Sequence, residues 1–214
     1  MKLYVSRLHY PVTVLGWGRR AGIWVQGCSV RCPGCIAQDT WLRRPGDASD
    51  TGTVLEWIES LPIESIDGIT ISGGEPFDQP SALAVLLAGL LEWRGRVGRH
   101  VDILCYSGHP FEELQRRHPA VLRMLDCIVP EPFVLDDPSE ASLIGSANQR
   151  VVPLTELGRA RYGIDLQPGR RQIQISADES NVWYIGIPAR GDMVRVMEAM
   201  RSRGVDQGEI SWRA

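Results

Sequence analysis

The sequence lacks several features that would place it in particular classes of protein. Its longest strongly apolar run, from Ala82 to Leu91, has ten residues, whereas a membrane-spanning helix needs about twenty. Basic residues are scattered and the net charge is -3, so we expect no positively charged surface for nucleic acid. A signal peptide, an internal repeat and a low-complexity linker are also missing. We therefore expect a compact cytoplasmic protein that binds neither nucleic acid nor membranes.

Cysteine is scarce and unevenly distributed. The chain has five cysteines among 214 residues, and three of them fall within eight positions as Cys28, Cys32 and Cys35. Cys105 and Cys127 stand alone inside apolar runs, where a free cysteine is typically a small buried hydrophobic residue. An odd count with such close spacing disfavours disulfide bonds. The cysteine pattern therefore indicates a reducing compartment.

The three clustered cysteines are the most informative feature of the chain. Three thiolates are one short of the four that complete a structural zinc or an ordinary iron-sulfur site. A metal centre held by Cys28, Cys32 and Cys35 would keep one coordination position open for chemistry. In a zinc site, the fourth ligand would come from His9, His109 or Cys105, which leaves a non-catalytic metal-binding module as one hypothesis.

A second segment that can bind a ligand follows the next expected strand. The buried strand 68–72 stops at Gly73 and Gly74, and Glu75 comes directly after them. Ligands of parallel α/β sheets bind at the carboxyl ends of the strands, where glycine lets the backbone approach a ligand closely. Glu75 would then offer a carboxylate to a cationic group.

The order of the expected elements indicates the fold class. Short apolar strands at 23–25, 68–72, 101–106 and 127–129 alternate with helical patterns at 53–61, 81–93, 110–114 and 120–124. This alternation predicts βα units around a parallel sheet, joined by right-handed crossovers. Four or five such units fall short of the eight of a closed barrel, so a partial (β/α) barrel is expected.

The pattern changes after Arg150. We expect a helix at 154–162, two strands at 171–176 and 182–187, and a closing helix at 193–203. This gives two domains, a core of residues 1–150 and an extension of residues 151–214. Because about fifty residues are only marginally stable alone, we expect this hairpin and helix to pack on the core.

Together these motifs resemble the radical S-adenosylmethionine enzymes. The resemblance rests on Cys28-x-x-x-Cys32-x-x-Cys35 and on the segment Gly73-Gly74-Glu75-Pro76, with support from Cys105-Tyr106-Ser107-Gly108 and from the segment 145–150. Within this superfamily, the chain is most similar to the activating proteins of anaerobic ribonucleotide reductase and, more distantly, to the pyruvate formate-lyase activating enzyme. The similarity covers about the first 150 residues.

The resemblance implies a set of cofactors and ligands. Cys28, Cys32 and Cys35 would hold three irons of a [4Fe-4S] cluster, whose fourth iron would chelate S-adenosylmethionine. Gly73, Gly74 and Glu75 would bind the methionine ammonium group, and Ser107 would lie near the ribose or a neighbouring site. An electron from the reduced cluster would cleave the sulfonium and give a 5'-deoxyadenosyl radical, so the scheme needs no catalytic side-chain acid or base.

The resemblance leaves the substrate open. The leading hypothesis is an activase for a glycyl-radical enzyme such as anaerobic ribonucleotide reductase, supplied with electrons by a flavodoxin- or ferredoxin-type donor. A stand-alone enzyme that modifies a peptide or a small metabolite is the alternative. Two departures from the family pattern bear on this choice. Ile36-Ala37 follows the third cysteine in place of the usual aromatic residue and asparagine, and the prolines of the segment 129–133 stiffen the loop there.

Two tryptophans flank the cysteine segment in the sequence. Trp17 precedes it and Trp41 follows it. Either ring is a candidate to shield a cluster or to face a partner. Asp78 and Gln79, just beyond Glu75, are expected to cap the next helix.

Overall fold

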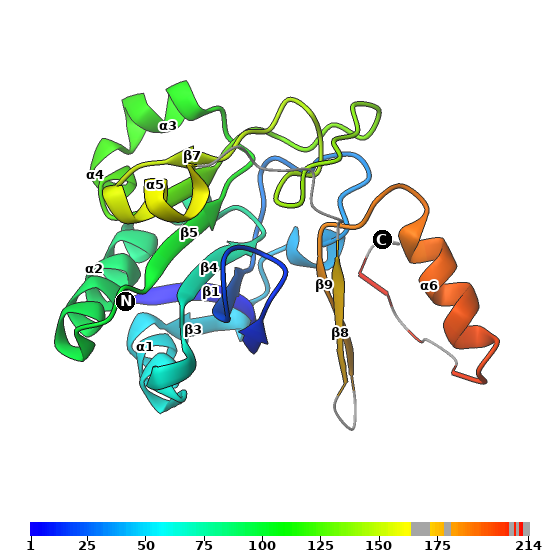
Figure 1. Cartoon of the computed structure of the whole chain (residues 1–214), viewed down its shortest axis with the longest axis horizontal. Coiled ribbons are helices and arrows are strands. Elements are labelled where there is room, and N and C mark those ends of the chain that lie inside the picture. Colours follow the sequence, from blue (N-terminus) through cyan, green and yellow to red (C-terminus); the bar gives the residue numbers. More distant parts are fainter. Residues whose placement is uncertain (164–171, 178–180, 206–207, 209, 212–214) are drawn as a thin grey trace.

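The computed structural model describes residues 1–163, 172–177, 181–205, 208 and 210–211, and is built around one central sheet (Figure 1). Seven strands of the described chain form this sheet. In sheet order they are β3 (Ala48–Asp50), β1 (Lys2–Val12), β2 (Arg20–Val25), β4 (Gly68–Gly73), β5 (Asp102–Tyr106), β6 (Cys127–Val129) and β7 (Val152–Pro153). The four central strands β2, β4, β5 and β6 are parallel, while β3, β1 and β7 pair antiparallel at the edges. The predicted α/β class with a largely parallel sheet is confirmed.

The first four helices connect the parallel strands and cover one face of the sheet, whereas the fifth follows β7 and contributes Tyr162 to the other face. Their bounds are α1 (Thr51–Ser60), α2 (Pro80–Val97), α3 (Phe111–Arg117), α4 (Pro119–Leu122) and α5 (Glu156–Tyr162). The most apolar run of the sequence forms the middle of α2, and its leucines at 83, 86, 87 and 90 are fully buried. Helix α2 is terminated by Gly98, whose φ of 64° lies in the left-handed region that glycine adopts easily. No helix of the described residues is both long enough and apolar enough to cross a bilayer.

Alternation along the strands separates the two faces of the sheet. Ile23, Val25 and Ile71 belong to the large core beneath the helices. Trp24 and Tyr106, one residue out of phase, belong to smaller apolar clusters on the other face. Successive side chains of a strand point to opposite faces, so the parallel strands are buried on both sides.

A buried ion pair closes this second face at the amino ends of the strands. Arg20 and Asp102 are fully buried, and the guanidinium donates to both carboxylate oxygens at 2.7 and 2.9 Å. Arg20 Nε also donates to Thr70 Oγ1 at 2.6 Å, and Tyr162 Oη donates to Asp102 at 2.8 Å. Arg161 of α5 adds a second cation to this carboxylate. Because α5 and β7 take part in the core in this way, the polypeptide up to residue 163 is packed on the sheet.

The remaining described residues form a separate small unit beside the sheet. Strands β8 (Ile173–Ala177) and β9 (Val182–Gly186) pair antiparallel and are followed by helix α6 (Asp192–Arg201). Figure 1 shows the strands and α6 on the side of the molecule opposite α2. Residue 171 of the strand expected at 171–176 lies outside the described residues.

The structure differs from the sequence-based expectation mainly at the sheet edges. The apolar segment at the start of the chain forms the first part of strand β1. This strand continues to Val12 and pairs with β2. The short edge strands β3 and β7 were not predicted, because three and two residues carry no measurable periodicity.

Candidate functional site

The three clustered cysteines lie in the loop that leaves the carboxyl end of β2. Backbone hydrogen bonds shape the start of this loop, since Gly27 N donates to Thr40 O at 2.7 Å and Cys28 N donates to Trp41 O at 3.1 Å. Gly27 has a φ of 99°, which a side chain would make costly. We call residues 26–41 the cluster loop. Its fold brings the three thiols to one end of the sheet before any ligand is considered.

Each of the three sulfurs has a backbone N–H directed at it. Arg31 N lies 3.5 Å from Cys28 Sγ, and Ala37 N lies 3.4 Å from Cys35 Sγ. The N–H of Phe133, from the loop after β6, acts in the same way on Cys32. Burial raises the pKa of all three thiols, and these N–H groups oppose that effect. Such donors stabilise thiolates, and hydrogen bonds to sulfur tune iron-sulfur clusters.

The described residues do not form a ready site for a single metal ion. Cys35 acts electrostatically on Cys28, and Cys32 acts electrostatically on Cys35. However, no three His, Cys, Asp or Glu side chains in the described ranges converge closely enough to hold one ion. Zinc would need four ligands at about 2.0–2.3 Å from one point. In a [4Fe-4S] cluster each thiolate binds a different iron, so the sulfurs lie further apart.

Trp41 supplies a further donor to this site. Its indole Nε1 is buried and makes no full hydrogen bond in the described part of the chain. The same group lies close enough to Cys35 to lower the pKa of that thiol, against the larger effect of burial. A buried donor beside a sulfur fits a site that gains negative charge when a cluster is bound.

The Gly-Gly segment packs directly on the cluster loop. A Cβ at Gly74 would lie 2.2 Å from Gly27 O, and a Cβ at Gly73 would lie 2.5 Å from Val25 N. Gly74 N donates to Val25 O and Glu75 N donates to Gly27 O, both at 2.8 Å. The two glycines were expected to admit a ligand. Here their small size admits the neighbouring backbone, which aligns the two loops.

Glu75 is buried and tightly hydrogen-bonded. Its side chain is 1% exposed. Oε1 accepts from Phe77 N and Ser107 Oγ, both at 2.9 Å, and Oε2 accepts from Gly108 N at 2.7 Å. Burial nevertheless raises the pKa of this carboxyl above its ordinary value. No lysine or arginine of the described ranges forms an ion pair with Glu75, and the charge of the nearby His109 opposes the rise in its pKa without cancelling it. A cationic ligand group would supply the missing charge.

Ser107 joins the predicted site through Glu75. It follows β5, is 4% exposed, and accepts a hydrogen bond from His109 N at 3.1 Å while it donates to Glu75. Cys105, in the same strand, is fully buried, and so is Cys127. Burial raises the pKa of Cys127 to about 12 and that of Cys105 well above its ordinary value. The expectation that these two cysteines are inert core residues is confirmed.

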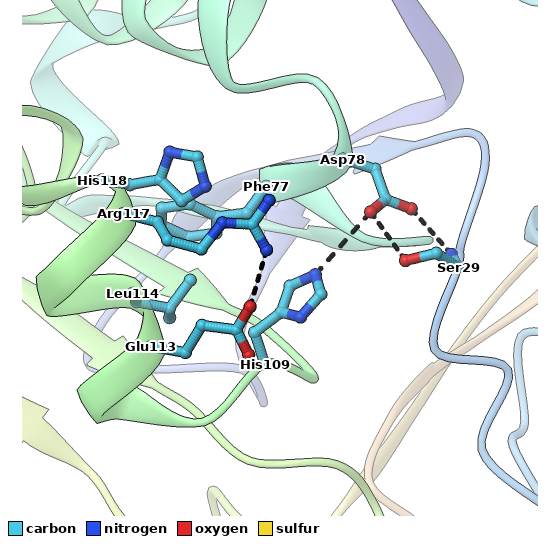
Figure 2. Close-up of a pocket in the computed structure, with 8 residues that line it drawn as sticks. All are labelled: Ser29, Phe77, Asp78, His109, Glu113, Leu114, Arg117 and His118. Carbon is cyan, nitrogen blue, oxygen red and sulfur yellow. Dashed lines mark hydrogen bonds and ion pairs between the residues drawn. The ribbon is translucent and has the colours of Figure 1, made fainter.

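A small polar cavity adjoins the site on the side of α3 (Figure 2). Asp78 accepts from both Ser29 N and Ser29 Oγ at 2.7 Å, and its Oδ1 lies 3.7 Å from His109 Nε2. The cavity measures about 190 Å³, below the roughly 300–1,000 Å³ of sites that enclose a drug-sized ligand. The cavity is therefore too small for S-adenosylmethionine itself. The bonds between the residues that line it hold the neighbours of the ligand residues in place.

Sequence reasoning missed or misplaced several residues of this region. Asp78 binds the cluster loop, and Gln79 bonds Tyr4 and Gln26, so neither side chain caps α2 as expected. Trp17 packs beneath Arg161 at 4.4 Å, beside the buried ion pair and not against the cluster loop. The contacts of Asp78 join elements far apart in sequence, which no local signal reveals.

Comparison with known proteins agrees with this geometry. The sequence matches the family described as 4Fe-4S single cluster domain over residues 14–152. The anaerobic ribonucleoside-triphosphate reductase-activating protein of Enterobacteria phage T4 is 29% identical over 143 residues, which cover 66% of this chain and 89% of that protein. The protein of the same name from Haemophilus influenzae is 31% identical over 149 residues, covering 66% of this chain and 92% of the relative.

A more distant relative has the other predicted name. The pyruvate formate-lyase-activating enzyme of Staphylococcus aureus is 31% identical over 146 residues, covering 65% of this chain and 57% of that enzyme. The matched family region contains the cluster loop, the Gly-Gly-Glu segment and Ser107. The chain therefore belongs to the 4Fe-4S single cluster domain family and, within the radical S-adenosylmethionine superfamily, to the group of anaerobic ribonucleotide reductase-activating proteins.

Proposed function

We propose that this protein is a glycyl-radical activase, an enzyme that uses a [4Fe-4S] cluster and S-adenosylmethionine to place a radical on a partner enzyme. When bound, the reduced cluster and S-adenosylmethionine supply a 5'-deoxyadenosyl radical that removes a hydrogen atom. The observation that carries the proposal is the alignment of the three-cysteine loop with a buried carboxylate that forms no ion pair with a lysine or arginine of the described residues. The named relatives support an anaerobic ribonucleotide reductase as the partner.

The residues of the site divide the work of binding. Cys28, Cys32 and Cys35 hold three irons, and the backbone N–H groups directed at their sulfurs stabilise the thiolates. Glu75 receives the ammonium group of the methionine moiety. An ionised carboxylate has about four acceptor sites, and the three hydrogen bonds to Glu75 leave room for one more donor.

Ser107 and the two glycines act on the position of Glu75. The Ser107 hydroxyl donates to Glu75 Oε1, so we assign it to the orientation of this carboxylate in preference to the ribose. Gly73 and Gly74 set the distance between Glu75 and the cluster loop through their backbone contacts. Burial of Glu75 and Ser107 excludes water from the bound ammonium group.

The finer features of the fold fit this function. We propose that the sheet is the partial barrel of radical S-adenosylmethionine enzymes, and that β8, β9 and α6 are the hairpin and helix of a C-terminal extension. The division into residues 1–150 and 151–214 stays a prediction, and the packing of β7 and α5 favours a boundary beyond residue 163. A cytoplasmic location and a flavodoxin- or ferredoxin-type donor follow from the need for a strong one-electron reductant.

Iron loading tests the cluster assignment. After anaerobic reconstitution we expect about four irons per chain, together with broad visible absorbance. Replacement of Cys32 by alanine should abolish both, since Cys32 lies half-exposed in the cluster loop. Cys127→Ala is the matched control, because this thiol is buried in β6 and should leave the iron content unchanged. One tightly bound zinc without iron would contradict the proposal.

Partner assays separate activase from stand-alone enzyme. With dithionite and S-adenosylmethionine we expect release of 5'-deoxyadenosine and, when an anaerobic ribonucleotide reductase is added, an electron paramagnetic resonance signal from a glycyl radical in that partner. A Glu75→Gln variant should load iron normally but bind S-adenosylmethionine more weakly. Turnover of a peptide or metabolite without any partner would instead establish the stand-alone alternative.

A further inference from the structure

The backbone that follows Cys35 is bonded to the far end of the protein. Gln38 N donates to Ser211 O at 3.0 Å, and Ser211 Oγ donates to Ile36 O at 3.0 Å. Ser211 thus bonds the cluster loop on both sides of Ala37, as a neighbouring strand would. The contact joins positions 175 residues apart, so it is made only by the folded extension.

The extension is itself fastened to the sheet through β1. Gln174 of β8 uses both ends of its amide, since Nε2 donates to Pro11 O at 2.7 Å and Oε1 accepts from Thr13 N at 2.9 Å. Trp183 of β9 lies 5.6 Å from the guanidinium of Arg7. These contacts fix the start of the extension at the end of β1.

An apolar cluster adds to this attachment. Ile185 of β9 is 4% exposed and packs with Val12 and Leu15 on the face of the sheet opposite the large helices. From this anchor the chain passes through α6 and returns to the cluster loop at Ser211 (Figure 1). The extension therefore spans from the sheet edge to the metal-binding end of the protein.

The extension lies outside the region shared with the matched family. That region ends at residue 152, and the activating proteins of phage T4 and Haemophilus influenzae are covered over 89% and 92% of their own length by only 66% of this chain. Ser211 thus lies outside the region that this chain shares with the family model.

We propose that the C-terminal extension is a clamp in cis on the cluster loop, with Ser211 as a positioning residue that holds the backbone from Ile36 to Gln38 and thereby shields Cys35. Holding a loop at a second point suppresses its local opening. Solvent exposure also helps to set the reduction potential of an iron-sulfur cluster. The consequence for the cluster rests on the proposed function, whereas the clamp itself can be tested in metal-free protein.

Thiol alkylation of the metal-free protein tests the clamp without any cofactor. The rate of iodoacetamide modification is followed for each cysteine by mass spectrometry. Ser211→Ala should raise the rate at Cys35 about fivefold, the effect expected for one neutral hydrogen bond, and leave Cys28 within about twofold of the parent protein. Ser211→Thr keeps the hydroxyl and should restore the original rate.

Ser202→Ala is the matched control, because this serine lies in the same extension and its hydroxyl donates to Ala199 O within its own turn. It should leave all three rates unchanged. An unchanged Cys35 rate in Ser211→Ala would overturn the clamp. So would an equal rise at Cys28, Cys32 and Cys35, since that would show general loosening of the loop.

The reconstituted protein gives a second readout. Ser211→Ala should lose iron to a chelator about fivefold faster than the parent and Ser202→Ala proteins, and its cluster potential should shift, with recovery in Ser211→Thr. If the parent protein binds no cluster, the proposed function fails while the alkylation result still decides the clamp. If iron binds but neither rate responds to Ser211→Ala, the clamp fails and the proposed function stands.

Discussion

Two buried carboxylates lie at opposite ends of the same sheet, and their surroundings differ in one respect. Asp102, at the start of β5, is paired with Arg20 and Arg161. Glu75, after the end of β4, accepts three hydrogen bonds but has no arginine or lysine partner among the described residues. Both side chains are at most 1% exposed. The two carboxylates therefore differ in whether an arginine side chain pairs with them.

The pKa values follow this difference. Burial alone would raise the pKa of Asp102, but the hydrogen bonds and charge of Arg20, with help from Arg161 and Tyr162, lower it overall. Burial raises the pKa of Glu75, and its hydrogen bonds only reduce that rise. A buried charge is tolerated when it is paired. The charge of Asp102 is thus balanced within the protein, whereas we expect a ligand to balance the charge of Glu75.

The largest expected effect on stability comes from removing the arginine that pairs with Asp102. Arg20→Ala leaves Asp102 buried with only its second cation, so we expect a loss of about 3–5 kcal/mol in the free energy of unfolding. Urea denaturation of the metal-free protein measures this loss. The exposed pair of Arg96 with Glu59 is the control, and Arg96→Ala should cost less than about 1 kcal/mol. Equal effects of the two changes would remove the distinction between the sheet ends.

A smaller effect is expected from separating the two loops of the ligand end. A Cβ at Gly74 would meet the backbone of Gly27, which cannot rotate away, so Gly74→Ala should destabilise the protein by about 1–3 kcal/mol. It should also reduce iron retention. Gly95→Ala, in the last turn of α2 where an added Cβ would meet no atom within 4 Å, should instead stabilise by up to about 1 kcal/mol. Normal iron retention in Gly74→Ala would show that the loops need not be aligned.

The smallest effect is a difference in pH dependence. Because the pKa of Glu75 is raised by folding, its contribution to stability is present below the pKa of the unfolded chain and declines as pH rises through the folded pKa. The lowered pKa of Asp102 has the opposite sign, so its contribution declines as pH falls through the folded pKa. In ligand-free protein, the stability of Glu75→Gln relative to the parent should therefore improve with rising pH.

Urea unfolding across the acidic to neutral range checks this sign. Asp102→Asn should behave in the reverse way, with its disadvantage largest at neutral pH and smaller in acid. Parallel stability curves for the parent protein and Glu75→Gln would show that the carboxyl of Glu75 titrates alike in the folded and unfolded chain.

Local sequence signals were sufficient for the centre of the sheet and for placing the candidate ligand residues at its carboxyl end. The apolar strands ending before Gly73 and at Tyr106 were recognisable because burial on both faces leaves few polar positions. The three cysteines and Glu75 were recognisable by spacing. The structure places them on neighbouring strand ends, as the parallel arrangement requires.

The partners of these residues could not be predicted, because they come from distant parts of the chain. Nothing in the sequence near Arg20 indicates that it will meet Asp102 across β4. The N–H of Phe133 reaches Cys32 only because the loop after β6 folds over the cluster loop. Glycine was correctly associated with close approach, but the group that approaches Gly74 is the Gly27 carbonyl.

Two hydrogen bonds, from Gly74 to the end of β2 and from Glu75 to the cluster loop, have a practical consequence for handling the protein. They exist between backbone groups and are made without any cofactor. The entropy cost of ordering these loops is therefore incurred during folding and not during ligand binding. Protein purified in air, with its cluster destroyed, should keep this frame and accept a new cluster without having to refold.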